Sequence, residues 1–397
     1  MKKILLSAFA TFCLIQAQTL DQIVQDALSN NYELKSIEKS IDLVNEQIKI
    51  SQNWKDPVLS FGVNDIWFDR PFDRDNEAMQ SQYIGLSQVV PITNKLDLQK
   101  DISHSDKKIN EVFLEDKKLE LKSKIYEYSY TIIVLEEKLK LLNKYELNIN
   151  KLEKLFSALY KYQKADINEI LNSKVSFENI KLKKQNLRNT IENFYLKLQQ
   201  ITFSKIENIQ ESINIQKINF SKVVSKHPKI KLLEQYIEKQ NSISKYEKSK
   251  KYSDIKVNVA YFQRDSKFKD YANISLNIPL SINNTQDIKS ISAKIKANEI
   301  KDKLENSKNN LQLQISILQN NLDTSVSNYD LIQKKVIPLQ KKIQKNLENY
   351  NSFDKVKPTK SIENLNKLIS YEIKALDEVQ SYYENYSKLL YITKKDN

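Results

Sequence analysis

The chain contains 397 residues, with 63 Lys and Arg against 50 Asp and Glu, which gives a net charge of +13. Only 2 residues are glycine, and Gly62 and Gly85 are too far apart for a P-loop, a dinucleotide-binding turn or a nucleophile elbow. With one cysteine, Cys13, and two histidines, His104 and His227, thiolate zinc sites, disulfide frameworks and Cys/His nucleophile pairs are also excluded. We therefore expect no enzymatic activity, no catalytic residue, no cofactor and no metal.

The N-terminus has the three parts of a secretory signal peptide: a short basic region, the apolar run 4–15, and a small residue, Ala17, that fits cleavage before Gln18. The apolar run is shorter than the roughly 20 residues that a membrane-spanning helix requires. Phe12 is bulky where a lipobox has a small residue, so lipidation of Cys13 is not expected. The sequence thus predicts export of a mature chain that begins at Gln18.

The rest of the chain consists of two similar halves. A repeat of this length indicates duplication of a whole subdomain rather than a solenoid. We expect a signal peptide at 1–17, a first helix-strand-strand-helix repeat at 18–214 and a second at 215–397, which together form one unit. Three pairs of segments match in the same order: 56–59 with 254–257, 83–91 with 271–279, and 169–172 with 363–366.

Each half contains two segments in which apolar and polar residues alternate. In the second half Ile274 and Leu276 alternate with Asn273 and Ser275, whereas Gln88 interrupts the apolar pattern in the first half. A period of two predicts strands with one apolar and one polar face. A soluble sheet packed on a helix is the alternative. The expected strands span roughly 57–68, 81–90, 254–262 and 271–280.

Aromatic residues cluster near the loop ends of these segments, as in the aromatic girdles of outer-membrane barrels. The loops 66–80 and 263–269 each join the two strands of a hairpin, so we expect them to lie side by side and to face the cell exterior. The aromatic residues concerned are Trp67, Phe68, Tyr83, Tyr261, Phe262 and Tyr271.

Long helices are expected between the strand pairs. Apolar residues recur at alternating steps of three and four from Ile125 to Leu159 and again from Leu311 to Tyr350, which is typical of a coiled-coil seam. Pro338 lies inside the second run and predicts a bend there. A run of this length gives a helix of up to about 100 Å, too long for a compact globule.

Four strands per chain cannot close a membrane barrel, because closed barrels contain at least about eight strands. Open strand edges in lipid would leave backbone groups unpaired, at several kcal/mol each. We therefore expect the chain to oligomerise, so that two, three or four copies together supply the strands of one closed barrel.

These features together resemble the outer-membrane efflux protein (TolC) family over nearly the whole mature chain. The resemblance implies a mainly α fold with a membrane β-barrel: a homotrimer whose four amphipathic strands per chain form one 12-stranded barrel, continued by long coiled-coil helices as an α-helical periplasmic tunnel. The segments that carry the resemblance are 27–31, 56–61, 85–88 with Pro91, 166–172, and Pro338-Leu339.

The resemblance also implies the function. It predicts the outer-membrane channel of a tripartite efflux or type I secretion system in a Gram-negative bacterium, with a large periplasmic part. Such a passive export duct has outer-membrane lipid, a periplasmic adaptor (membrane fusion) protein and an inner-membrane transporter as partners. The sequence does not reveal the cargo.

The candidate functional residues lie at the turns between the paired long helices. The acidic positions that ring the periplasmic aperture in the family match Glu363 and Asn366, and Glu169 is the corresponding candidate in the first half. Glu169 and Glu363 equally suit the start of a helix, where an acid complements the helix dipole, so this reading stays open. The family's turn glycine is missing from both tips. Candidate adaptor-docking residues at the tips are Lys161, Lys164, Asp166, Lys355, Lys357 and Lys360.

Two other function classes compete with a duct. A basic cytosolic coiled coil that binds nucleic acid would explain the charge but neither the signal peptide nor the strands. Acidic residues also interleave with the lysines along every long segment, as on a solvated helix, so no nucleic-acid partner is expected. A secreted structural coiled-coil protein or adhesin would explain the signal peptide but not the duplicated strand pairs.

Overall fold

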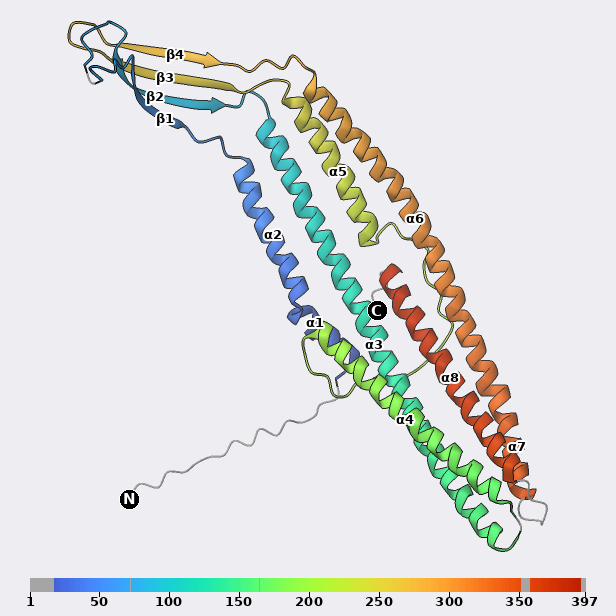
Figure 1. The fold of residues 1–397 in the computed structure, drawn as a ribbon. Coiled ribbons are helices and arrows are strands. Elements are labelled where there is room, and N and C mark those ends of the chain that lie inside the picture. The colour runs from blue at the N-terminus through green and yellow to red at the C-terminus, as the bar shows by residue number, and fades with distance from the viewer. Residues whose placement is uncertain (1–17, 72, 164, 351–357, 394–397) are drawn as a thin grey trace, which may run out of the picture. The chain divides into compact units, whose positions relative to one another are not determined.

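The computed structural model describes residues 18–71, 73–163, 165–350 and 358–393 (Figure 1). The predicted signal peptide, with Cys13, lies outside these residues and stays a prediction. The chain divides into two compact units, and each draws on both halves of the sequence; the predicted repeat boundary at 214 also stays a prediction. One unit contains Met1–Lys35, Asp116–His227 and Asn309–Asn397, and the other contains Ser36–Glu115 and Pro228–Lys308.

Three helices run from one unit into the other, and the remaining elements belong to a single unit. The shared helices are α2 (Tyr32–Ser51), α3 (Lys95–Lys161) and α6 (Thr285–Leu331). The first unit also contains α1 (Leu20–Asn30), α4 (Ile167–Thr202), the π-helical turn η1 (Ile332–Val336), α7 (Ile337–Tyr350) and α8 (Pro358–Thr393). The second unit contains α5 (Pro228–Ser249) and the strands β1 (Val58–Asn64), β2 (Ser81–Val90), β3 (Ile255–Gln263) and β4 (Tyr271–Asn277).

The four strands form one antiparallel sheet in the order β1-β2-β3-β4. All four predicted strands are present, and β2 has the predicted bounds. β1 ends earlier than predicted because Asp65 adopts a left-handed conformation, with φ 54°, which turns the chain out of the sheet. β4 ends before Pro279, which has no backbone N–H to donate to a ladder.

Helix α5 joins the neighbouring helices of the second unit through polar contacts. Lys239 Nζ lies 2.5 Å from Asp106 Oδ1 on α3. Ser244 Oγ donates to the carbonyl oxygen of Ser290 on α6 at 2.9 Å, and both serines are buried. This hydrogen bond links α5 to α6 in a buried position.

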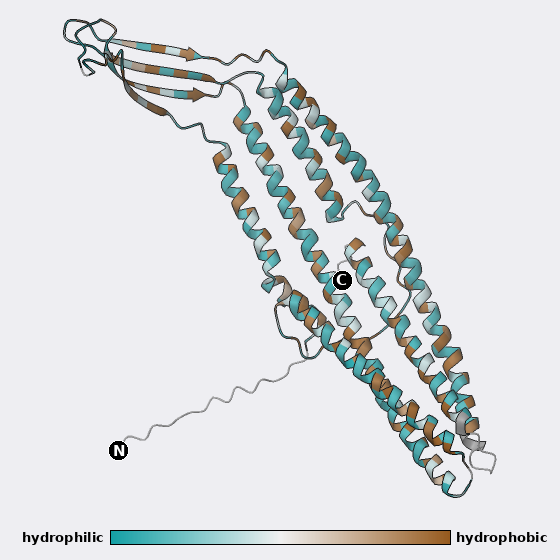
Figure 2. Cartoon of the chain, in the orientation of Figure 1, coloured by the Kyte–Doolittle hydropathy of each residue, from teal (hydrophilic) through white to brown (hydrophobic). Residues whose placement is uncertain are grey.

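The first unit contains two helical hairpins, one formed by α3 and α4 and the other by α7 and α8 (Figure 1). The predicted seam of α3 is confirmed, because every one of its residues is buried or half-buried. Apolar positions along the helices are interspersed with polar ones (Figure 2). No helix of the described residues is both long enough and apolar enough to cross a bilayer. The buried seam residues are Ile125, Ile132, Leu135, Leu142, Ile149 and Phe156.

The predicted bend at Pro338 takes the form of a π-helical turn, η1, immediately before α7. The backbone N–H of Ile337 donates to the carbonyl of Ile332, five residues earlier. A proline cannot donate to the carbonyl four residues before it, and its ring crowds that carbonyl. The wider turn accommodates the proline without ending the helical path, as is common for π-bulges.

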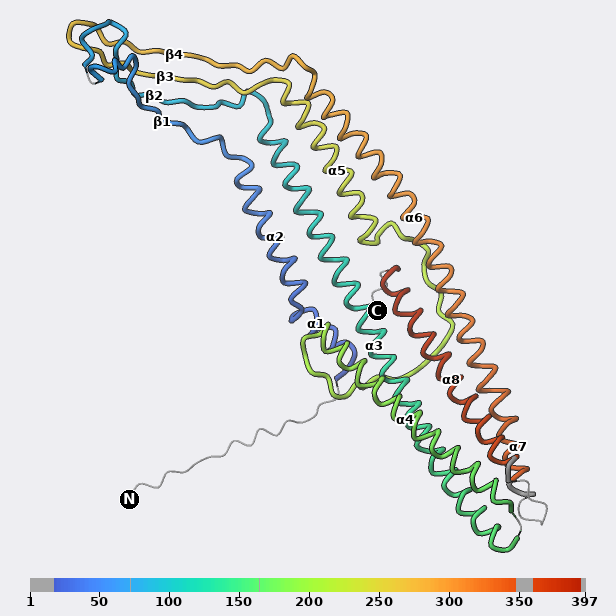
Figure 3. The backbone as a smooth tube through the Cα atoms, viewed as in Figure 1, coloured from blue at the N-terminus to red at the C-terminus, as the bar shows by residue number. Residues whose placement is uncertain are grey.

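A segment without long helices or strands, residues 203–227, connects α4 to α5 and docks on α6 and α8 of the first unit (Figure 3). Gln319 of α6 donates through Nε2 to the Ile218 carbonyl at 2.7 Å. Tyr382 of α8 donates through its hydroxyl to the Gln216 carbonyl at 3.0 Å. These side chains satisfy backbone groups that have no helical or strand partner.

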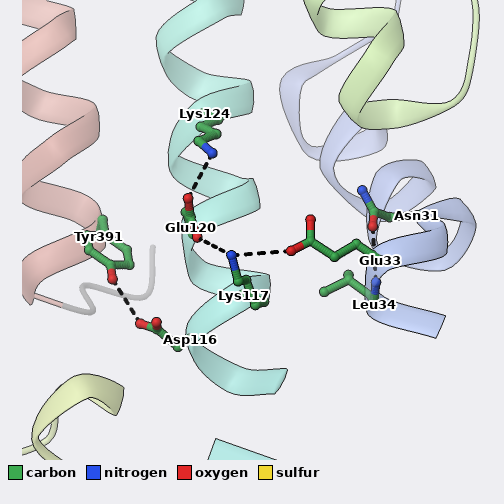
Figure 4. Close-up of polar contacts among 8 residues, drawn as sticks. All are labelled: Asn31, Glu33, Leu34, Asp116, Lys117, Glu120, Lys124 and Tyr391. Carbon is green, nitrogen blue, oxygen red and sulfur yellow. Dashed lines mark hydrogen bonds and ion pairs between the residues drawn. The ribbon is translucent and has the colours of Figure 1, made fainter. Parts of the chain in front are cut away.

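A polar cluster links α3 to the N-terminal helices and to α8 (Figure 4). Lys117 Nζ lies 3.1 Å from Glu120 Oε2 and 3.2 Å from Glu33 Oε1. The hydrogen bond with Glu120 raises the pKa of Lys117. Tyr391 of α8 donates to Asp116 Oδ1 at 2.9 Å, and burial raises the pKa of this tyrosine. The cluster is structural, since its charges are satisfied by one another.

Candidate functional site

The register of the sheet separates its residues into two chemically distinct faces. Directly opposite residues in antiparallel strands lie on the same face. Leu86 pairs with Leu59 and with Val259, and Val259 pairs with Ile274, so an apolar row crosses all four strands. Gln88, opposite Val257, interrupts this face, and the apolar residues around it include Leu59, Phe61, Ile84, Leu86, Val257, Val259, Tyr261, Ala272, Ile274 and Leu276.

No described side chain covers the central part of this apolar face. Phe61 is 80% exposed and Ile274 is 74% exposed, on the first and last strands. Leu59, Leu86 and Val259, one on each of the first three strands, are exposed as well. Monomeric soluble proteins rarely expose a contiguous apolar patch of this kind. The face therefore needs an apolar environment that the described chain does not provide.

The opposite face is polar and closely packed near its centre. Gly85 lies between Ser60 and Ala260 in the register. A Cβ at Gly85 would lie 2.9 Å from Ser60 Oγ, so a larger residue would displace this side chain. The remaining residues of this face are mainly serine, asparagine and aromatic side chains.

Three aromatic rings form a row on the polar face. The sequence predicted that these residues belong to an aromatic girdle on the outer, apolar side of a barrel, and for them this prediction is wrong. The ring centroids of Tyr83 and Phe262 lie 5.4 Å apart, and those of Phe262 and Tyr271 lie 4.7 Å apart. Of the predicted girdle residues within strands, only Tyr261 lies on the apolar face. The guanidinium of Arg264 lies 5.1 Å from the Tyr271 centroid and extends the stack. The row is thus not part of the apolar face.

The two hairpin loops lie side by side, as predicted. Lys267 Nζ lies 3.2 Å from Asp75 Oδ2, and Arg264 Nη1 donates to the Ala78 carbonyl at 3.1 Å. The hydrogen bond from Lys267 lowers the pKa of Asp75. These contacts connect the β1–β2 loop to the β3–β4 loop. Their predicted exposure at the cell surface stays a prediction.

The sheet has two open edges. β1 pairs only with β2, and β4 pairs only with β3, among the residues that the structure describes. The outer backbone groups of both edge strands therefore have no ladder partner within the described part of the chain. Unprotected edges of this kind pair readily with another chain.

At the first helical tip, two candidate residues form a capping box. Asp166 is the N-cap of α4, and its Oδ1 accepts from the Asn168 N–H at 2.9 Å. Glu169 Oε2 in turn accepts from the Asp166 N–H at 3.1 Å. This reciprocal pair stabilises the start of the helix. The helix-start reading of Glu169 is therefore correct, and the geometry leaves an aperture role untested.

At the second tip, Glu363 is exposed, and it forms no hydrogen bond or ion pair with any described residue. Asn366 Nδ2 donates to Ser176 Oγ of α4 at 3.4 Å, which links the two hairpins. Next to them Ile362 packs into a small buried cluster with Phe156 and Ile170. The two candidate regions thus lie close together in the first unit.

The proposed docking residues are only partly within the described chain. Lys161 ends α3 and Lys360 lies in the first turn of α8, and both are exposed. Lys164, Lys355 and Lys357 lie outside the described residues. The structure therefore gives positions for Lys161, Asp166 and Lys360 alone among the docking candidates.

Sequence analysis missed polar contacts within the α7–α8 hairpin and between the two hairpins. Gln340 Nε2 of α7 donates to Asn364 Oδ1 at 2.5 Å, and Asn364 Nδ2 donates to Gln344 Oε1 at 2.8 Å. Tyr145 of α3 donates to Glu372 Oε2 of α8 at 2.6 Å. The polar residues stand among apolar ones in the sequence, but nothing in the pattern indicates their partners. No group of three metal-ligating side chains is present among the described residues.

No protein-family model and no curated protein matches the sequence. Among solved structures, the chain is similar to the CmeC outer membrane channel of Campylobacter jejuni, with a TM-score of 0.77 and 16% identity over 95% of this chain and 87% of that chain. It is also similar to the outer membrane protein VceC of Vibrio cholerae, with a TM-score of 0.76 and 10% identity over 94% of this chain and 95% of that chain.

A third similar structure is the open state of the MtrE outer membrane channel of Neisseria gonorrhoeae, with a TM-score of 0.77 and 13% identity over 94% of this chain and 88% of that chain. These likenesses extend over nearly the whole length of each chain. They show that this chain has the fold of these outer-membrane proteins, which confirms the expected chain fold of long helices with four strands.

Proposed function

We propose that this chain is the outer-membrane channel of a tripartite efflux or type I secretion system, acting as a passive export duct. The observation that carries the proposal is the four-stranded sheet, which has one exposed apolar face and two open edges. The fold, which CmeC and MtrE share, supports the same conclusion.

The apolar face fits a lipid environment. Fully burying a side chain the size of Leu, Ile or Phe is worth about 1.5–3 kcal/mol relative to leaving it in water. Phe61 on the first strand and Ile274 on the last are among the most exposed residues of this face. A bilayer would cover the face at no cost in protein contacts. The polar face, with its serine and asparagine side chains, would then line the aqueous lumen.

The open edges support oligomerisation. Each unpaired backbone group costs several kcal/mol in hydrocarbon, so isolated edge strands do not persist in a membrane. We infer that β4 of one chain pairs with β1 of the next and that three chains close one 12-stranded barrel. The sheet order fits this arrangement, because the first and last strands of the chain are its two edges.

The helical tips are the proposed contact region for a periplasmic adaptor protein, which in turn contacts an inner-membrane transporter. The exposed positions of Lys161 and Lys360 support this role. Glu363, Asn366 and Glu169 are the proposed aperture residues, and Glu363 is the strongest of them because its carboxylate is exposed. A duct of this kind needs no catalytic residue, and the likeness to channel proteins supports a non-enzymatic role.

Fractionation and mass measurement test the proposal. We expect the full-length protein in the outer-membrane fraction of a Gram-negative host and a trimer after extraction in mild detergent. A soluble protein, or a monomer or dimer in every detergent tested, would contradict the proposed function.

A further inference from the structure

A cavity of about 670 Å³ lies in the second unit, where the sheet meets its helices. β2 leads into α3 there, and α5 leads into β3 (Figure 1). The volume is within the roughly 300–1,000 Å³ of small-molecule sites. Aromatic and basic side chains line the cavity together: Trp54, Tyr246, Lys55, Lys95, Lys250 and Lys256.

Two of the lysines are neutralised by acidic partners. Lys95 is buried, and its Nζ lies 2.7 Å from Asp254 Oδ1 in the same cavity. Lys250 Nζ lies 2.8 Å from Glu247 Oε1. These ion pairs stabilise the wall of the cavity and contribute little net charge to it.

The other two lysines give the cavity its excess positive charge. Lys55 and Lys256 are exposed, and neither forms an ion pair with a residue that the structure describes. Trp54 is 54% exposed, so part of its ring is accessible beside them. The ring of Tyr246 already holds the Lys250 ammonium, 4.2 Å from its centroid. An accessible aromatic surface next to unpaired lysines is complementary to an organic anion that carries an aromatic ring.

The register assigns the cavity to the polar side of the sheet. Lys256 pairs with Val89 and Asn277, and all three line the cavity. The next row, which contains Val257 and Leu276, belongs to the apolar face. Because successive residues of a strand point to opposite faces, the cavity lies on the face away from lipid. This placement favours a water-soluble ligand over a phospholipid.

We propose that this cavity binds a small aromatic anion, a carboxylate or sulfonate carried on one or two fused rings. The ring packs against Trp54, and the anionic group lies between Lys55 and Lys256. For its biological meaning the inference rests on the proposed function, because such a compound is then a class of cargo recognised on the lumen side of the duct. Binding itself requires only the second unit's cavity.

Fluorine NMR tests the proposal on the full-length protein in detergent. The chain has 2 tryptophans, so with fluorotryptophan the Trp54 signal reports on the cavity and the Trp67 signal is an internal control. The variant Trp67→Phe assigns the two signals. The probes are naphthalenesulfonate and naphthylmethylammonium, which share a ring system and differ in charge. We expect a saturable shift of the Trp54 signal with the sulfonate alone.

Lysine variants test the role of charge. We expect Lys55→Gln and Lys256→Gln each to weaken sulfonate binding about threefold, the order of effect of a partly exposed charge pair. Binding should weaken further at high salt. The matched control is Lys301→Gln, an exposed lysine of α6 outside the cavity, which should leave the affinity unchanged.

Several results would overturn the inference. Equal shifts with both probes, equal shifts at both tryptophans, or unchanged affinity in the double variant of Lys55 and Lys256 would each show that the cavity does not recognise an anion. A Trp54 shift with anionic phospholipid but not with the sulfonate would assign the cavity to lipid. If the protein is a trimer in the outer membrane but does not bind the sulfonate, this inference is wrong and the proposed function still holds. If the protein is a soluble monomer that binds the sulfonate, the proposed function is wrong and the binding site still holds.

Discussion

Adjacent residues of β4 can decide which face of the sheet contacts lipid. Ile274 is 74% exposed on the apolar face and pairs with Val259, whereas Asn273 pairs with Ala260 on the polar face. Ile274 is the central residue of the strand, so it should lie near the bilayer midplane. We therefore compare Ile274→Arg with Asn273→Arg, which place the same charge one residue apart.

The expected difference is large. An arginine on the lipid face of a barrel costs about 2–4 kcal/mol at the midplane and roughly 0–1 kcal/mol near the interfaces. On the polar face the guanidinium stays in water and should cost less than about 1 kcal/mol. In a trimer the three lipid-facing arginines together would cost roughly 6–12 kcal/mol. Ile274→Ala measures the part of the effect that comes from lost apolar contact.

The assay is reversible urea unfolding of the protein refolded into phospholipid vesicles, with the free energy of unfolding taken from linear extrapolation. We expect Ile274→Arg to lower this free energy well below that of Ile274→Ala and Asn273→Arg to leave it nearly unchanged. Equal losses for the two arginine variants, or a larger loss for Asn273→Arg, would refute the assignment of the apolar face to lipid.

Two further predictions concern the tyrosines and the loops. Burial raises the pKa of Tyr126 and of Tyr383 to about 12. Above pH 10 the unfolded chain therefore loses phenolic protons that the folded chain keeps, and the free energy of unfolding should fall as pH rises from 10 toward 12. Phenolate absorbance that appears fully at pH 10 while the helices remain folded would contradict this. Asp73→Cys, in the exposed β1–β2 loop, should react with a membrane-impermeant maleimide on intact cells. Lys301→Cys on α6 is the control that should stay unlabelled. An unlabelled cysteine at position 73 would count against the placement of this loop outside the cell.

The strands could be predicted closely because the period-two pattern reports directly on a two-faced sheet. Their ends were less predictable. β1 stops at a left-handed Asp65, a conformation that aspartate tolerates but does not require, so no unique strand end could be derived from the pattern. β4 stops before Pro279, and here the proline could have been used to shorten the prediction.

The faces of the aromatic residues could also have been obtained from the sequence. Tyr83 precedes Ile84, and Phe262 follows Tyr261, so alternation alone puts Tyr83 and Phe262 opposite the apolar row. The girdle prediction used only proximity to the loops and ignored this parity. What alternation cannot give is the lateral register, which brings Tyr271 next to Phe262 and completes the stacked row.

The helical region shows where sequence patterns stop being informative. The three–four spacing predicts the buried seam of α3, because burial on one side of a helix needs only the helix period. The contacts of Asn364 with Gln340 and Gln344 depend on the register between α7 and α8, which no local pattern specifies. The π-helical turn before Pro338 likewise depends on how tertiary packing resolves the proline's clash, since a kink or a helix end would resolve it equally well.

The two candidate aperture acids, which the sequence presents as equivalents, should behave differently. Glu169 accepts from the Asp166 N–H, so Glu169→Gln should keep the cap and Glu169→Ala should lower the stability of the first tip by about 1 kcal/mol. Glu363 is exposed and has no such bond, so Glu363→Gln and Glu363→Lys should leave the unfolding free energy unchanged.

If Glu363 faces the entrance of the duct, Glu363→Lys should change the conductance of reconstituted channels and its dependence on divalent cations, because it replaces a carboxylate with a cation on each chain. Glu169→Gln should alter conductance less, since its carboxylate is held at the start of α4. Hydrogen exchange of the first turn of α4 and single-channel recording separate the two roles. Unchanged conductance in Glu363→Lys, together with a clear change in Glu169→Gln, would reverse the assignment and make the capping residue the aperture acid.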